Sequence, residues 1–219
     1  MARSGAFKGW PVEAIEFYEG LEADNSKTYW QEYKPVYERA VKAPMEALLT
    51  ELASEFGAGK IFRPNRDIRF SADKSPYKTA IAATLERGGY VSLSSSGLGA
   101  GSGMYMMASD QLDRYRQAVS DDKTGSEIAD LVATVTRGGI EVSAHEALKT
   151  APKGYPKDHP RLDLLRQKGL ITWRQWPVGA WLGTAKAKTR IVEFLHAAEP
   201  INQWLERNVG PSTIEGAYR

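Results

Sequence analysis

The segment from residue 63 to residue 79 holds the residues of this chain best suited to chemistry. It reads Arg-Pro-Asn-Arg-Asp-Ile-Arg-Phe-Ser-Ala-Asp-Lys-Ser-Pro-Tyr-Lys-Thr, with five cationic side chains against two acids. Arginine presents a planar fork of donors that matches a carboxylate or a phosphate in a bidentate way. Three arginines in so short a segment therefore predict a site that recognises an anion.

Each residue type in this segment suggests a role. We expect Arg66, Arg69 and Lys78 to contact the anion, and Asp67 or Asp73 to orient these cations or to act as a general base. Hydroxyl groups in the same segment would add hydrogen bonds. Together with two residues of a later segment, the predicted ligand-binding set is Arg66, Arg69, Ser71, Lys74, Tyr77, Lys78, Lys153 and His159.

A second basic island covers residues 149–174, where seven Lys or Arg residues stand against two acids. Because the whole chain is nearly neutral, two such islands favour one cationic site. We therefore expect Lys153 or His159 to lie within roughly 10 Å of the first segment, about one Debye length. His159 and Asp163 are four residues apart and would suit a metal ion, but we favour His159 as a cap for a helix that begins at Pro160.

Composition excludes several classes of protein. The chain has 219 residues, a net charge of +2 and no cysteine, so disulfides, thiolate catalysis and iron–sulfur clusters are excluded. No apolar stretch approaches the roughly 18 residues of a membrane span, and the first residues lack a signal-peptide pattern. We expect a soluble cytoplasmic protein without membrane contact, metal or cofactor. Gly97, Gly99, Gly101 and Gly103 do not match a dinucleotide fingerprint, because position 102 is Ser102.

Periodicity predicts helices at both ends of the chain and strands between them. Apolar residues recur at helical spacing from Pro11 to Phe56, with a kink or restart at Pro35, and the tyrosines and Trp30 of this region are interpreted as core. Further helices are predicted at about 109–120, 125–137 and 186–208, the last interrupted at Pro200. This order favours a single α+β domain over residues 1–219, with a central, mostly antiparallel sheet flanked by the N-terminal and C-terminal helices.

The predicted strands include a hairpin. Residues 79–86 and 90–95 alternate around an Arg87-Gly88-Gly89 loop, which would pair Leu85 with Val91 and gather the apolar side chains on one face. Strands are also predicted at 66–71, 104–108, 140–143 and 170–176. The glycine-rich stretch 94–103 is interpreted as a flexible turn that could close over the neighbouring site.

These residues resemble the uncharacterised family known as domain of unknown function 2461. The resemblance rests on Asn25 with Trp30, on the stretch 66–78, and on two stretches of the second island, 148–155 and 159–168. Members often have two adjacent asparagines, where this chain has Asp24-Asn25. The resemblance spans nearly the whole chain and implies a single α+β domain, but it implies no reaction.

Three hypotheses of function remain. The first is a site for a phosphorylated or carboxylated small molecule. The second is a nucleic-acid-binding module, in which the two islands track phosphates and Tyr155 or Trp30 stacks on a base. The third is a structural network in which arginines and aspartates pin a sharp turn without a ligand. The sequence assigns neither a reaction nor an oligomeric state.

Overall fold

The protein has an α+β fold, as the sequence predicts. The computed structural model describes residues 6–69 and 72–216. Contacts within the chain group it into two compact units, and each is described by itself. Unit 1 comprises Met1–Ala100 and Gln175–Glu193, and unit 2 comprises Gly101–Arg174 and Phe194–Arg219. The prediction of a single domain stays a prediction.

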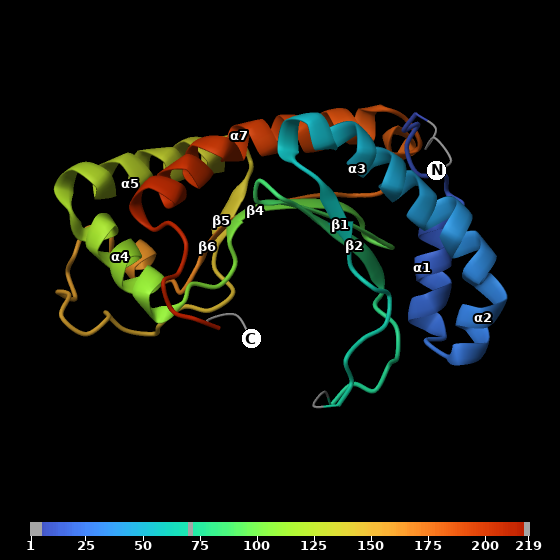
Figure 1. Ribbon diagram of the computed structural model, residues 1–219, viewed down its shortest axis with the longest axis horizontal. Coiled ribbons are helices and arrows are strands. Elements are labelled where there is room, and N and C mark those ends of the chain that lie inside the picture. Colours follow the sequence, from blue (N-terminus) through green and yellow to red (C-terminus); the bar gives the residue numbers. More distant parts are fainter. Residues whose placement is uncertain (1–5, 70–71, 217–219) are drawn as a thin grey trace. The chain divides into compact units, whose positions relative to one another are not determined.

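Helices dominate both ends of the chain, and strands occupy its middle (Figure 1). In chain order the elements are α1 (Glu13–Ala23), α2 (Lys27–Val36), η1 (Tyr37–Lys42), α3 (Ala43–Phe56), β1 (Gly59–Ile61), β2 (Ala80–Leu85), β3 (Gly89–Ser94), β4 (Gly97–Met104), α4 (Ser109–Ser120), α5 (Asp122–Arg137), β5 (Glu141–Ser143), α6 (Leu162–Leu165), β6 (Leu170–Trp176), η2 (Ala180–Gly183) and α7 (Lys186–Asn208).

The strands are ordered β1-β2-β3-β4-β6-β5 in an antiparallel sheet. In the registers of β1 with β2, β2 with β3, and β5 with β6, the partner strands run antiparallel. The predicted strands at 140–143 and 170–176 are confirmed to within one residue as β5 and β6. Strand β1 has no counterpart in the sequence prediction, because a three-residue strand carries too little alternation to be recognised.

The N-terminal helices pack an aromatic core in unit 1. Ser26 caps α2 by accepting a hydrogen bond from the backbone N–H of Tyr29. Trp30 and Tyr37 are buried, as the core interpretation predicts, and their ring centroids lie 4.9 Å apart. The interpretation is wrong for Tyr33, which is 38% exposed. Helix α2 continues through Pro35 and passes directly into the π-helical turn η1, so the expected restart is a local change of helical pitch.

The loop of the β2–β3 hairpin lies one residue earlier in the chain than predicted, and this changes which residues pair. Val91 pairs with Ala83, not Leu85, so the three-residue loop is Glu86-Arg87-Gly88. Moving the loop centre by one residue shifts the pairing by two positions, and side chains therefore keep their faces. The predicted apolar face is confirmed, because its side chains are at most 3% exposed: Ile81, Ala83, Leu85, Val91 and Leu93.

The glycine-rich stretch is not the flexible turn that the sequence predicts. Its glycines belong to the buried strand β4. A Cβ atom at Gly97 would lie 2.2 Å from the carbonyl oxygen of Trp176, and Gly97 has a φ of +117°. Glycine is required there because the neighbouring backbone approaches too closely for any side chain. The separate strand predicted at 104–108 is also wrong, since only Met104 is in a strand.

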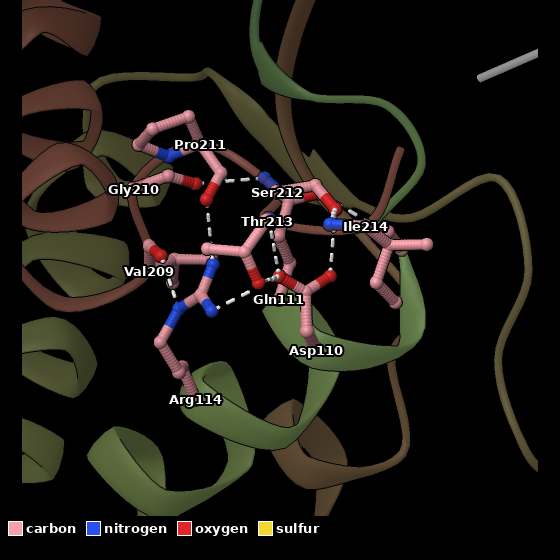
Figure 2. Close-up of polar contacts among 10 residues, drawn as sticks. Asp110, Gln111, Arg114, Val209, Gly210, Pro211, Ser212, Thr213 and Ile214 are labelled. Carbon is pink, nitrogen blue, oxygen red and sulfur yellow. Dashed lines mark hydrogen bonds and ion pairs between the residues drawn. The ribbon is translucent and has the colours of Figure 1, made fainter. Parts of the chain in front are cut away.

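In unit 2, helix α4 anchors the segment that follows α7. Figure 2 shows polar side chains of α4 directed at residues 209–214. Arg114 donates from Nε to the carbonyl of Val209 (2.6 Å) and from Nη2 to that of Pro211 (2.7 Å). Asp110 accepts from the Ser212 hydroxyl and the Thr213 backbone N–H, both at 2.8 Å. These contacts fix the chain after α7 onto α4.

Helix α7 corrects one further expectation. It runs from Lys186 to Asn208 without a break, and Pro200 lies inside it. Pro200 is exposed, so the carbonyl that loses its hydrogen-bond partner can be hydrated by water. The predicted interruption is therefore wrong.

Candidate functional site

The arginine-rich segment forms the connection between β1 and β2. We call residues 62–79 the excursion, because Figure 1 shows this connection extending away from the two strands. The strand predicted at 66–71 is wrong over its described part, because residues 66–69 are not in a strand. Alternation of charged and apolar residues here reflects a surface loop, in which one side of the chain is half-buried and the other is exposed.

The base of the excursion is closed by backbone hydrogen bonds. Asn65 and Tyr77 form an isolated antiparallel bridge. On either side of this bridge, the backbone N–H of Arg66 donates to the carbonyl of Pro76 (2.9 Å), and the backbone N–H of Lys78 donates to the carbonyl of Pro64 (2.8 Å). The excursion therefore leaves and rejoins the sheet through a narrow neck that holds its cationic part in place.

Asn25 and Trp30 fix this neck to the N-terminal helices. The side-chain amide of Asn25 donates from Nδ2 to the carbonyl of Tyr77 (3.1 Å) and accepts at Oδ1 from the backbone N–H of Tyr77 (3.0 Å). The ring of Tyr77 is 7% exposed and stacks on Trp30, with centroids 4.4 Å apart and an angle of 11° between the planes. Tyr77 is thus part of the anchor, and its predicted hydroxyl bond to a ligand stays a prediction.

Arg69 holds a carboxylate in the bidentate manner that the sequence predicts for a ligand. Its Nε donates to Oδ1 of Asp67 (3.0 Å), and its Nη2 donates to Oδ2 (2.7 Å). The side chain of Arg69 is 76% exposed and that of Asp67 is 45% exposed. The hydrogen bonds from Arg69 hold the pKa of the Asp67 carboxyl below its ordinary value.

A second pair lies beside the first. Arg66 donates to the carboxylate of Asp73, which also accepts from the backbone N–H of Ser75 at 2.9 Å. Hydrogen bonds from Ser75, followed by that from Arg66, hold the pKa of Asp73 below its ordinary value. Asp67 and Asp73 are each held by an arginine of the same segment, and their role as a general base stays a prediction.

The remaining predicted residues of the excursion have separate positions. Lys74 is exposed and donates from Nζ to the carbonyl of Ile68 (3.0 Å). Lys78 is half-buried, with its Nζ 5.4 Å from the ring centroid of Phe62. Ser71 lies outside the described residues. The structure therefore gathers Arg66, Asp67, Arg69, Asp73, Lys74 and Lys78 on one excursion.

The second basic island belongs to unit 2, where its buried arginine has a structural role. The Arg161 guanidinium, whose side chain is 12% exposed, donates from Nε to Val119 (2.7 Å) and from Nη2 to Ser120 (3.0 Å), at the end of α4. His159 accepts at Nδ1 from the backbone N–H of Arg161 (3.0 Å). Helix α6 begins at Leu162, with Arg161 at its N-cap and no side-chain cap, so the predicted helix that begins at Pro160 with His159 as its cap is wrong. Lys153 is exposed, and its union with the excursion in one site stays a prediction.

Some residues of interest were not predicted as site residues. Asn25 enters the sequence analysis through the family resemblance and not as a site residue, because nothing in the sequence signals a contact with a residue 52 positions away. Tyr105 and His145 of unit 2, which are 40 residues apart, form a hydrogen bond at 2.7 Å and line a cavity. Isolated residues of these types carry no spacing signal, so only the fold reveals that they meet.

Within residues 6–69 and 72–216, no three His, Cys, Asp or Glu side chains gather in a way that could hold a metal ion. No helix in the same ranges has the length and apolar character needed to cross a bilayer.

Comparisons with known proteins identify a family. The family model described as "Conserved hypothetical protein (DUF2461)" matches residues 13–204. A search of curated proteins gives no match. A solved structure, of a conserved hypothetical protein from Pyrococcus furiosus, matches with 12% sequence identity, covering 77% of this chain and 98% of its own, at a TM-score of 0.40. So distant a structural match adds nothing to the assignment of a function.

Proposed function

Since this chain belongs to the DUF2461 family of conserved hypothetical proteins, whose description gives no activity, we propose that its excursion recognises the phosphate or carboxylate group of a ligand. Arg66 and Arg69 would make the principal contacts, and Lys74 and Lys78 would add positive charge. The excursion carries five cationic residues and two aspartates, a net charge of +3. Its field therefore attracts anions in a chain that is otherwise nearly neutral.

The bidentate contact of Arg69 with Asp67 is the observation that carries the proposal. The guanidinium already has its Nε and Nη2 donors directed at the two oxygens of one carboxylate. A ligand carboxylate, or two oxygens of a phosphate, would accept from the same donors with the same geometry. The Asp67 carboxylate thus occupies the position in which we place the ligand anion.

The purely structural alternative requires these ion pairs to hold the turn. The neck is anchored without them, by Asn25, by the stack of Tyr77 on Trp30 and by backbone hydrogen bonds. Exposed ion pairs contribute only about 0–1 kcal/mol, because water and salt compete for both partners. The exposed Arg69–Asp67 pair therefore stabilises the turn only weakly, and little free energy is lost when a ligand anion replaces Asp67.

A nucleic acid is the second candidate, and the exposure of the cations favours it. An extended phosphate backbone binds along projecting cations and does not require an enclosing cavity. Base stacking on Trp30 is not supported, because Trp30 is 9% exposed and its ring is stacked against Tyr77. The two candidates share one chemistry, recognition of phosphate, and differ in the length of the ligand.

The test compares arginine variants in ligand titrations. Inorganic phosphate, pyrophosphate, a nucleoside triphosphate and a single-stranded oligonucleotide are titrated against the wild type, Arg69→Ala and Arg69→Lys, with binding measured by calorimetry. Arg39→Ala is the matched control, since Arg39 forms an exposed ion pair with Glu13 in the same unit. We expect both Arg69 variants to lose most of the affinity, because lysine is a point charge and cannot form the fork.

Three outcomes decide between the hypotheses. Saturable binding of pyrophosphate or the triphosphate that depends on Arg69 supports a small phosphorylated ligand. Binding of the oligonucleotide alone, with a steep dependence on salt, supports the nucleic-acid candidate. If Arg39→Ala weakens binding as much as Arg69→Ala, or if no anion binds, the proposed role of the excursion is wrong.

A further inference from the structure

Unit 2 contains a small cavity, and none of the residues that the proposed function uses lines it. Its volume is about 190 Å³, the space of roughly six molecules of liquid water. Its lining combines an aromatic hydroxyl, an imidazole, two opposite charges and apolar side chains. The lining residues are Tyr105, Met106, Met107, Ala108, His145, Glu146 and Lys168.

The aromatic part of the lining is a tyrosine–histidine pair. The hydroxyl of Tyr105 and Nδ1 of His145 lie 2.7 Å apart, and the two rings stack with centroids 4.6 Å apart at 27°. Tyr105 is 55% exposed, and Met106 beside it is 56% exposed. Large apolar side chains with this exposure, beside a cavity, are typical of a surface that a ligand covers.

The charged part of the lining is an ion pair between Lys168 and Glu146, whose backbones are also hydrogen-bonded to each other. Nζ of Lys168 lies 2.5 Å from a carboxylate oxygen of Glu146, and the backbone N–H of Lys168 donates to the carbonyl of Glu146 at 2.9 Å. The backbone N–H of Met107 in turn donates to the carbonyl of Lys168 at 3.2 Å. These bonds hold the backbones of Met107, Glu146 and Lys168 together beside the cavity, and the side chains of Lys168 and Glu146 are 36% and 63% exposed.

We propose that this cavity binds a small zwitterion, a free α-amino acid with an aliphatic side chain. The ligand carboxylate would pair with Lys168, and the ligand ammonium would pair with Glu146. The aliphatic part would lie against Met106 and Met107, whose flexible thioether side chains adapt to irregular shapes. The Tyr105–His145 pair would form the opposite wall.

The two opposite charges of the wall favour a zwitterion over a simple carboxylate or a simple amine. A simple carboxylate would pair with Lys168 but would also face the negative charge of Glu146. A simple amine would pair with Glu146 but would face the positive charge of Lys168. Only a ligand that carries both charges a few bonds apart replaces the existing ion pair with two new ones and leaves no repulsion. The volume of about 190 Å³ is sufficient for a single amino acid.

The experiment uses three ligands of nearly equal shape. L-leucine is compared with 4-methylpentanoate, which lacks the amino group, and with 3-methylbutylamine, which lacks the carboxylate. Binding is followed by NMR through the methyl signals of Met106 and Met107, which lie in the cavity wall. We expect a saturable shift of these signals with leucine and none with either half-ligand over the same concentration range.

Variants of the wall complete the test. Glu146→Gln and Lys168→Met should each weaken leucine binding by at least about tenfold, the effect of removing roughly 1.4 kcal/mol of interaction. Glu127→Gln is the matched control, because Glu127 forms an exposed ion pair with Arg207 elsewhere in unit 2. Equal binding of 4-methylpentanoate and leucine, absence of a saturable leucine shift, or full leucine affinity in both wall variants would each overturn the inference.

Discussion

Asn25 offers the sharpest test of how the excursion is held. Its side chain accepts from the backbone N–H of Tyr77 and donates to the carbonyl of the same residue. Substitution by alanine removes both partners at once. Tyr77 is 7% exposed, so water reaches its backbone poorly and replaces these bonds only in part.

The magnitude follows from the number of bonds. A typical hydrogen bond contributes about 0.5–1.5 kcal/mol net, so the loss of two is expected to cost about 1–3 kcal/mol of unfolding free energy. Asn25→Asp is a more selective change. The carboxylate still accepts from the Tyr77 N–H, but its second oxygen faces the Tyr77 carbonyl oxygen and repels it, so we expect Asn25→Asp to cost at least as much as the alanine variant.

Urea unfolding followed by circular dichroism measures the effect. A lower midpoint with an unchanged slope identifies a loss of stability. Asn65→Ala is the matched control, because Asn65 is exposed and joins Tyr77 through a backbone bridge that alanine retains. If Asn25→Ala unfolds at the same urea concentration as the wild type, or if Asn65→Ala costs as much, the amide of Asn25 is not the anchor of the neck.

Two further predictions concern unit 2. Arg161→Ala removes three hydrogen bonds to backbone carbonyls at the end of α4; we expect a loss of about 2–3 kcal/mol in urea unfolding, and an unchanged midpoint would contradict the capping role. The backbone N–H of Thr213 is the chief cause that holds the pKa of Asp110 below its ordinary value of 3.8. The ionised carboxylate therefore stabilises the folded state above about pH 4. This stabilisation is lost as the pH falls through the lowered pKa. Asp110→Asn should therefore be less stable than the wild type at pH 7, by a difference that shrinks in acid unfolding series below about pH 4; a constant difference would refute this.

The elements that the sequence predicts well are those whose periodicity is local. Helix α4 and strand β6 match their predicted bounds, and the hairpin faces are correct even though the loop is shifted by one residue. Faces depend only on the alternation within each strand, whereas the loop position depends on turn geometry that several tripeptides around Gly88 satisfy.

The failures arise where distant segments decide the local structure. Gly97 lies in a strand because Trp176, 79 residues later, approaches its backbone, and no local pattern contains that contact. Composition alone favoured a loop there. Pro200 was expected to interrupt a helix, but its exposed position allows the helix to continue.

The candidate site shows the same division. Charge counting locates the excursion, because cations cluster in sequence. The sequence also suggests that Asp67 or Asp73 orients these cations, and each carboxylate does pair with an arginine. It does not show that Asn25 anchors the neck, since this depends on the path of the chain. It also overstates the second island, in which Arg161 serves to cap a helix.

The most direct measurement of the central claim is an NMR titration of pyrophosphate that follows the arginine Nε–H signals. The proposed role of the excursion predicts saturable shifts at Arg66 and Arg69, as the donors exchange an aspartate for the ligand, with no comparable shift at Arg39. It also predicts that the Arg66 shift vanishes in the Arg69→Lys variant. Equal, unsaturated shifts at Arg39 and Arg69, or no shift at Arg69, would contradict the claim that the excursion is an anion-binding site.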